Sequence, residues 1–316
     1  MIAHIEQETR AHGDRAVVVP AQRLQELRRD IDRLKHDNVL NDFQRHIVDG
    51  IYALDTPDVG LEVRSIVVVA TPSVAATITL TRRGRSIPVS IPPGYVGNVS
   101  APIAIERYLN EALSPMGHRV RHAPRIPKKL LAVRSGLGVY GRNNLCYVEG
   151  MGSLLNLVTF YCEAPCPEGV WRPVRAMDAC RGCEACLSAC PTGAIMRDRF
   201  LIDNTRCLTY LNEVGKEYDG FPEWAPPSAH HTAYGCSRCL EVCPENRAYI
   251  GRPGVQVAFT EEETDLLLQG LPLEDLPTDL QAKVNALDMA GYLGALPRNL
   301  RALGVTTFHS FWGQFG

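Results

Sequence analysis

The stretch Cys180-Arg-Gly-Cys183-Glu-Ala-Cys186-Leu-Ser-Ala-Cys190-Pro191 decides the fold of this 316-residue chain. It is followed by Cys207 and by a second run, Cys236-Ser-Arg-Cys239-Leu-Glu-Val-Cys243-Pro244. A compact cysteine run that ends in Cys-Pro can give three thiolates to one 4Fe-4S cluster, while its fourth cysteine binds a neighbouring cluster. The eight cysteines therefore predict two complete 4Fe-4S sites, which must be close together because each run contributes to both.

The same spacing predicts which cysteines bind each cluster. The first three cysteines of the first run lie on a tight loop that can surround one cluster, and the last cysteine of the second run completes that site. The remaining cysteine of the first run then joins Cys207 and the start of the second run. We therefore expect cluster 1 at Cys180, Cys183, Cys186 and Cys243, and cluster 2 at Cys190, Cys207, Cys236 and Cys239.

Zinc sites and disulfides fit this spacing less well. Structural zinc needs four donors per site and has no use for a three-cysteine run followed by Cys-Pro. Disulfides would require an exported chain, and the first residues, MIAHIEQETRAHGD, lack the apolar region of a signal peptide. We expect the three other cysteines, Cys146, Cys162 and Cys166, to be buried or incidental thiols.

The charge and hydropathy of the chain exclude a strong bulk attraction to polyanions or membranes. The formal net charge is -2 at pH 7, which gives no electrostatic pull toward nucleic acid or an anionic bilayer. The apolar stretches, such as Ser65 to Ala70, have the length of strands and not of bilayer-spanning helices. These features predict a cytoplasmic protein without a membrane partner.

The residues around the cysteine array predict an α+β fold in three parts. Residues 1–175 alternate strand and helix signals, as an α/β layer for a cofactor and a substrate would. Residues 176–250 hold all eight cysteines and predict a bacterial two-cluster ferredoxin-like module, in which ligand loops replace a hydrophobic core. Residues 251–316 predict short helices that pack on the rest.

Several elements of the outer parts can be predicted from periodicity and turn residues. Arg64 to Ala70 indicates a buried strand, and residues 75–80 and 86–91 alternate as a hairpin around Arg82-Arg83-Gly84. Thr260, followed by three glutamates, indicates a capped helix start. Lys128-Lys129 is expected on the solvated face of a helix that spans residues 127–135.

The cysteine array and its surroundings resemble the epoxyqueuosine reductase family. The likeness includes Arg206-Cys207-Leu-Thr209-Tyr210-Leu211 beside the array, and the upstream turn Arg134-Ser-Gly136-Leu-Gly138-Val-Tyr-Gly141-Arg142-Asn143-Asn144. Gly152-Ser153 and Arg64-Ser65, which precede strands, are similar as well. The similarity runs in order from about residue 60 to about residue 305, which two ferredoxin motifs alone would not produce.

The resemblance implies a reductase that depends on iron-sulfur clusters and cobalamin. That family holds base-off cobalamin between an α/β domain, akin to the corrinoid domain of reductive dehalogenases, and the two-cluster module. Electrons would pass from an external low-potential donor, such as ferredoxin or flavodoxin, through the clusters to cobalamin and then to a substrate. By position, the residues expected near the corrin are Asn143, Asn144, Thr209, Cys236 and Ser237. Thr209 and Ser237 have an alternative role as polar residues that steady the cluster loops.

The chain departs from the family pattern at the expected proton donor. Epoxyqueuosine reductases have an aspartate shortly before the helix that leads to the Gly-Leu-Gly turn, where it is thought to protonate the opening epoxide. Here the stretch is Arg121-His122-Ala123-Pro124-Arg125-Ile126-Pro127, without a carboxylate. His122 is the nearest candidate donor, because imidazolium can serve near neutral pH. A structural histidine at a strand end is the alternative.

A second departure concerns tRNA. Longer members of the family carry a C-terminal helical-repeat domain that helps to bind tRNA, and this sequence ends soon after residues 299–303. Together with the balanced charge, this makes tRNA a doubtful partner. The sequence thus favours a reductase acting on a small molecule or a modified nucleoside. The alternatives are reduction of epoxyqueuosine in tRNA, with His122 in place of the aspartate, and an electron-transfer or corrinoid-reducing protein without substrate chemistry of its own.

Overall fold

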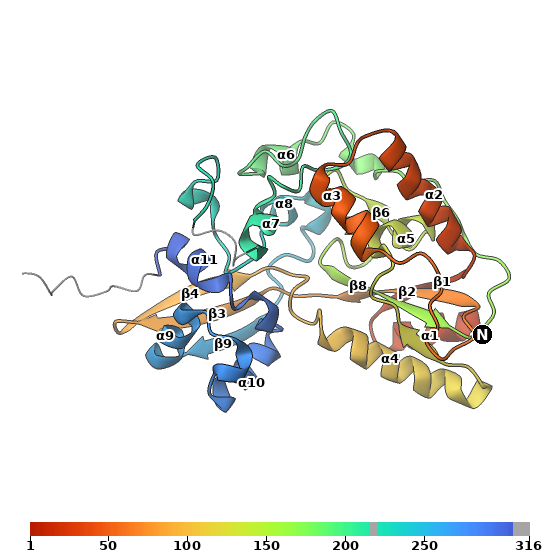
Figure 1. Ribbon diagram of the computed structural model, residues 1–316, viewed down its shortest axis with the longest axis horizontal. Coiled ribbons are helices and arrows are strands. Elements are labelled where there is room, and N and C mark those ends of the chain that lie inside the picture. Colours follow the sequence, from red (N-terminus) through yellow and green to blue (C-terminus); the bar gives the residue numbers. More distant parts are fainter. Residues whose placement is uncertain (215–219, 306–316) are drawn as a thin grey trace, which may run out of the picture.

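A computed structural model of the chain describes residues 1–214 and 220–305, which form a mixed α/β fold with three small sheets (Figure 1). A four-stranded sheet with helices on both faces forms one side of the molecule. A three-stranded sheet with the C-terminal helices forms the other side, and the short helices of the cysteine module lie above both (Figure 1). No helix among the described residues is long and apolar enough to cross a bilayer.

The four-stranded sheet is antiparallel throughout, and its second strand in order, β2, is buried on both faces. Ile66 and Val68 of β2 pack with α2 and α5, whereas Val67 and Val69 pack with α1 and α4. Side chains of a strand alternate between its faces, so an unbroken valine-rich run requires apolar cover on both. This confirms the predicted buried strand. The elements are α1 Ile2–Ala11, β1 Arg15–Pro20, α2 Arg23–His36, β2 Ser65–Pro72, α4 Ser100–Leu113, η2 Ser114–Met116, β5 Val120–His122, α5 Lys128–Arg134 and β8 Leu155–Cys162, with the strand order β1-β2-β8-β5.

The three-stranded sheet joins the predicted hairpin to the C-terminal part of the chain. Strands β3 and β4 pair around Arg83, as predicted, and β9 runs parallel to β3, which the sequence did not predict. Ile78, Leu80 and Phe259 share one core with the C-terminal helices. Residues of the first and third predicted parts therefore share one sheet and one core. The predicted domain boundaries, after residues 175 and 250, remain a prediction. The elements are β3 Ala76–Arg82, β4 Arg85–Ile91, β9 Val255–Phe259, α9 Glu261–Gln269, η6 Leu273–Asp275, α10 Thr278–Ala286, η7 Ala290–Tyr292 and α11 Leu296–Ala302.

The predicted cap of the C-terminal part is present. Thr260 accepts a hydrogen bond from the backbone N–H of Glu263 at 3.2 Å, and the Glu263 carboxylate accepts one from the Thr260 N–H at 2.8 Å. This reciprocal pair fixes the start of α9. Residues 306–316 of the predicted third part lie outside the described residues.

The cysteine module consists of short helices between ligand loops. Its small apolar core contains Leu208, Leu211, Ala225 and Ala229, so packing alone gives it little stability. The elements are η3 Asp178–Cys180, α6 Ala185–Ala189, α7 Leu208–Glu213, η4 Pro227–Ala229, α8 Arg238–Glu241 and η5 Pro244–Asn246. Outside the module, Cys146, Cys162 and Cys166 are buried free thiols, as predicted.

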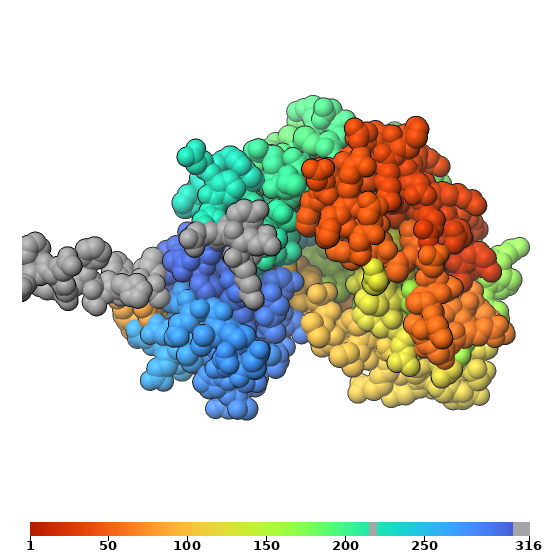
Figure 2. All heavy atoms as spheres, in the orientation of Figure 1, coloured from red at the N-terminus to blue at the C-terminus, as the bar shows by residue number. Residues whose placement is uncertain are grey.

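Four short elements connect the main sheet to the cysteine module. Helix α3, Asp42–His46, continues into the π-helical turn η1, Ile47–Ile51, and the small strands β6, Val139–Tyr140, and β7, Cys146–Tyr147, flank the Asn143-Asn144 turn. Asn41 and Gln44 form a capping box that fixes the start of α3. In the space-filling view the red and orange N-terminal segment abuts the green cysteine module (Figure 2).

Candidate functional site

The eight cysteines of the array line two separate cavities. Those predicted for cluster 1 line one cavity together with Arg142 and Tyr147, and those predicted for cluster 2 line a second cavity with Thr209. Asn143 lines both cavities, so the two spaces are neighbours. The structure thus brings together each predicted ligand set, and the ligation itself remains a prediction.

The cysteine thiols lie along the walls of these cavities and do not converge on a single point. Within residues 1–214 and 220–305, no three His, Cys, Asp or Glu side chains form a group that could hold one metal ion. A 4Fe-4S cube needs spaced thiolates, because each of them binds a different iron. Burial raises the pKa of the Cys236 thiol to about 12, so its thiolate requires the positive charge that iron supplies. The residues present therefore fit two cubane clusters.

Cluster 1 also has hydrogen-bond donors directed at its sulfur atoms. The backbone N–H of Arg142 donates to Cys180 Sγ at 3.3 Å, and the Tyr147 hydroxyl donates to Cys243 Sγ at 3.1 Å. Donors of this kind stabilise negative charge on the thiolates and tune the reduction potential of a cluster. Sequence reasoning did not assign Arg142 or Tyr147 a role, although Arg142 belongs to the quoted Gly-Arg-Asn-Asn turn.

A large, mainly apolar cavity of about 350 Å³ adjoins the cluster 2 cavity. Ile202, in the loop before Cys207, lines both of them, so the two spaces are adjacent. The wall of the large cavity comes from α2, α3, η1, the start of α5 and the loop of residues 200–204. Its size and lining are typical of small-molecule and cofactor sites. Its polar or charged lining residues are Asp30, Arg33, Gln44, Tyr52, Lys129, Tyr140, Asn144 and Asn204.

Helix α3 closes one side of this large cavity and is bonded to the cysteine module. The Asn41 amide donates to Asn204 Oδ1 at 2.9 Å, and the Gln44 amide donates to the carbonyl oxygen of Ile202 at 3.1 Å. Phe43 packs edge-on against Tyr210 of α7, with ring centroids 4.5 Å apart. The cavity is therefore formed only where the N-terminal part and the module meet.

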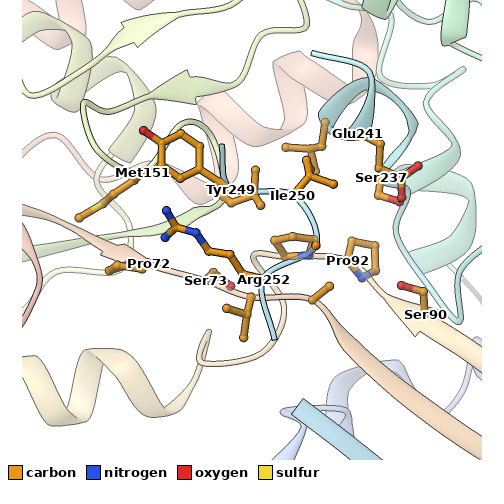
Figure 3. Close-up of a pocket in the computed structure, with 16 residues that line it drawn as sticks. Pro72, Ser73, Ser90, Pro92, Met151, Ser237, Glu241, Tyr249, Ile250 and Arg252 are labelled. Atoms are coloured by element: carbon orange, nitrogen blue, oxygen red, sulfur yellow. The ribbon is translucent and has the colours of Figure 1, made fainter. Parts of the chain in front are cut away.

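A smaller pocket of about 180 Å³ lies on the other side of α8, between the module and strands β2 and β4 (Figure 3). Ser237 and Glu241 reach it from the module, and Arg252 projects into it beside Tyr249 (Figure 3). The Arg252 guanidinium lies 4.7 Å from the centre of the Tyr249 ring. The Ser237 hydroxyl donates to Glu241 Oε1 at 2.6 Å and is 3.2 Å from His231 Nε2. Ser237 is thus held by its own module.

The five residues predicted to contact a corrin do not line a common cavity. Asn144 lines the large cavity, whereas Thr209 and Cys236 line the cluster 2 cavity. Asn143 lines both cysteine cavities, and Ser237 lines the smaller pocket. Of this set, Asn144 has the position best suited to a ligand in the large cavity.

His122, the predicted proton donor, lies at the end of β5 and is not among the lining residues of the large cavity. Its backbone N–H donates to Glu106 Oε2 at 3.1 Å, and its buried Nε2 has no hydrogen-bond partner within the described part of the chain. Burial lowers the pKa of His122, which favours the neutral ring near pH 7. A neutral imidazole is a poorer acid than the imidazolium that the prediction assumed.

Lys129 is exposed at the start of α5, as predicted. It also lines the large cavity, where its Nζ donates to the carbonyl oxygen of Asn144 at 3.0 Å. Although solvent reaches the side chain, desolvation by the neighbouring protein lowers the pKa of its ammonium group. Helical periodicity could not predict its place at the cavity, because it does not reveal which neighbouring segments build one.

Comparisons with known proteins agree with this geometry. Residues 179–246 match the 4Fe-4S double cluster binding domain family. The chain is 29% identical to the epoxyqueuosine reductase of Cellulophaga algicola over 207 residues, which cover 62% of each protein. It is 33% identical to that of Shewanella oneidensis over 153 residues, or 44% of this chain and 37% of that protein. This chain is a relative of the epoxyqueuosine reductases.

Solved epoxyqueuosine reductases share the fold of the whole chain. The Bacillus subtilis structure, in which a catalytic loop is swung out of the active site, superposes with a TM-score of 0.61 at 19% identity, covering 96% of this chain and 82% of that protein. An epoxyqueuosine reductase solved with an epoxyqueuosine-modified tRNA stem loop gives a TM-score of 0.60 at 18% identity, covering 96% and 81%. In sequence, the chain matches less than two thirds of the length of its curated relatives.

Proposed function

We propose that this protein is an iron-sulfur reductase in which two 4Fe-4S clusters carry electrons to a cobalamin and then to a substrate in the large cavity. The observation that carries the proposal is the adjacency of the three spaces. Asn143 lines both cysteine cavities, and Ile202 lines the cluster 2 cavity and the large cavity. In this proposal the N-terminal part is a corrinoid-binding-like α/β domain, and residues 176–250 are a two-cluster ferredoxin-like module.

Each group of residues has a defined part in this function. The eight cysteines hold the clusters, and the donors Arg142 and Tyr147 stabilise charge on cluster 1. The apolar wall of the large cavity excludes water, while Asn144 and Lys129 present polar groups inside it. Cobalamin, when bound, would supply the low-potential centre that reduces the substrate. An external low-potential donor such as ferredoxin or flavodoxin would restore the electrons, and the reducing cytoplasm is the proposed location.

The relatives favour a modified nucleoside as the substrate class, because they are epoxyqueuosine reductases and one was solved with a modified tRNA stem loop. A small molecule that enters the cavity remains the other proposed class. The net charge of -2 gives no general attraction to tRNA. Binding of tRNA would therefore need a local surface of positive charge.

Anaerobic reconstitution tests the cluster and cobalamin steps separately. Protein supplied with iron and sulfide should bind about eight irons per chain, four for each cluster. Added cobalamin should then develop a base-off visible spectrum. About four irons would contradict the ligand sets. Eight irons without cobalamin binding would favour the alternative function, an electron-transfer protein without substrate chemistry.

Turnover of an epoxyqueuosine-modified stem loop, with dithionite-reduced flavodoxin as donor, tests the substrate class. The His122 prediction is tested in the same assay by comparing His122→Ala with its neighbour Arg121→Ala. If His122 protonates the substrate, only the first variant loses activity, by about 10²-fold to 10⁴-fold. Equal activity of the two variants would leave His122 with a structural role.

A further inference from the structure

We propose that Lys129 is the proton donor of the large cavity and protonates an oxygen atom of the substrate during reduction. This inference rests on the proposed reductase function and adds a residue to it. Reduction of a carbon–oxygen bond requires a proton donor beside the substrate, and His122 does not line the cavity. Lys129, in the first turn of α5, supplies one.

The first argument is the lack of a carboxylate partner. Lys129 Nζ bonds to a backbone carbonyl, that of Asn144, at 3.0 Å. In contrast, Lys283 pairs with Glu263 at 2.7 Å, and Lys35 pairs with Asp49. Among the residues that the structure describes, no carboxylate lies within ion-pair distance of Lys129. Its remaining two N–H groups are therefore available to a ligand.

The second argument is the backbone that holds Lys129. Asn144 has a φ of +60°, in the left-handed region that non-glycine residues rarely adopt. Its turn is closed by hydrogen bonds from Asn144 N–H to the Gly141 oxygen at 3.0 Å and from Gly141 N–H to the Leu145 oxygen at 2.9 Å. Unusual backbone of this kind persists where the surrounding structure enforces it, often at functional sites. The turn directs one carbonyl at Lys129, while the neighbouring Asn143 lines both cysteine cavities.

The other ionisable groups of the cavity wall are unsuitable as donors. Burial raises the pKa of Asp30, while Arg134, in an ion pair with it at 3.2 Å, opposes that shift and occupies the carboxylate. Arg33 cannot release its proton in a protein. Burial raises the pKa of Tyr52 and of Tyr140, so both phenols hold their protons tightly. Lys129 is then the lining group whose proton is both present and releasable.

The protein around Lys129 sets the strength of this acid. Desolvation is the main cause that lowers the pKa of Lys129. An acid whose pKa lies closer to the working pH transfers its proton more readily than an ordinary lysine does. The reacting oxygen would be reached by one of the N–H groups that does not bind Asn144.

The step balances for reductive removal of an epoxide oxygen. Two electrons from the reduced clusters and two protons break both carbon–oxygen bonds, form a carbon–carbon double bond and release the oxygen as water. Lys129 gives one proton to the departing oxygen, and solvent gives the second proton to the same oxygen. A reduced one-electron carrier of the ferredoxin or flavodoxin class restores both clusters, and water restores the Lys129 ammonium.

The experiment compares Lys129→Gln, Lys129→Arg and the neighbouring control Lys128→Gln in anaerobic protein loaded with clusters and supplied with cobalamin. The first readout needs no substrate. The chain has only five lysines, so reductive ¹³C-methylation and NMR titration can assign each one by its loss in a variant. We expect one dimethyl-lysine signal to titrate below the ordinary lysine range, and to vanish in both Lys129 variants but not in Lys128→Gln.

The second readout is turnover of an epoxyqueuosine-modified stem loop. Lys129→Gln should lower kcat by about 10²-fold to 10⁴-fold with little change in KM, and Lys129→Arg should recover little because its proton is not released. An ordinary titration of Lys129, or a Lys129→Gln variant as active as the wild type, would overturn the proposal. Wild-type protein with loaded clusters that reduces nothing would instead overturn the reductase function on which it rests.

Discussion

The cysteine module and the large cavity are assembled in different ways. All eight cysteines of the module fall between residues 180 and 243, and their spacing alone groups them into two sets. The cavity beside them is lined by segments that extend from Asp30 to Asn204 and meet only after folding. The electron supply is thus encoded by local spacing, whereas the acceptor site depends on tertiary packing. Mutations in the cysteine module should therefore have different measurable effects from mutations around the large cavity.

Removal of iron should produce the largest difference between the two regions. The module has a small apolar core, whereas the four-stranded sheet is packed on both faces. We expect chelation under reducing conditions to expose residues 178–247 to a protease first, because the ligand loops depend on the metal for their order. The N-terminal sheet should persist as a resistant fragment, detected by mass spectrometry. Simultaneous loss of both regions would show that the sheet also requires the clusters.

A Cys207→Ser variant should sharpen the comparison within the module. Cys207 is the cysteine between the two runs and lines only the cluster 2 cavity. We expect iron content to fall by about four atoms per chain, with cluster 1 retained. Cys166→Ser is the matched control, because Cys166 is a buried free thiol outside the module. Full iron content in Cys207→Ser would contradict the assignment of cluster 2.

Leu27→Ala should act on the sheet region without changing the clusters. Leu27 on α2 is completely buried against β2, so its truncation should lower the free energy of unfolding by about 2–5 kcal/mol. Denaturant unfolding of the N-terminal region would measure this, and iron content should stay the same. The exposed neighbour Arg29→Ala should cost less than about 0.5 kcal/mol. Loss of iron from Leu27→Ala would mean that the two regions are energetically coupled.

Tyr147→Phe should give the smallest effect, at the boundary between the regions. The variant removes the hydroxyl that donates to Cys243 Sγ, a contribution of about 0.5–1.5 kcal/mol. We expect the reduction potential of cluster 1 to fall slightly, because the thiolate loses a donor that favours the more negative state. Redox titration monitored by EPR should show no shift for cluster 2. An equal shift of both clusters would indicate a change in the whole module.

The sequence predicted the module better than the cavity for a physical reason. Ligand loops are specified by intervals of two or three residues, and the hairpin around Arg83 by a turn that needs positive φ. Lys129 is exposed as expected, but its place in the cavity wall could not be predicted, because a lysine at a helix start gives no sign of which segments lie beside it. Strand β9 was missed since five alternating residues give a weak signal, and its partner β3 lies far away in the chain. Ser237 followed the family pattern in sequence, yet its side chain turns to a different pocket.

The parallel pairing of β3 with β9 has a consequence for synthesis of the chain. Leu80 pairs with Phe259, so β3 has no neighbour on that side until the ribosome has made almost the entire protein. At about 5–20 residues per second, the exposed edge waits on the order of ten seconds or more. An open edge of this kind can pair with another nascent chain. Yield at high expression should therefore depend on chaperone supply and translation speed, whatever the final stability of the folded protein.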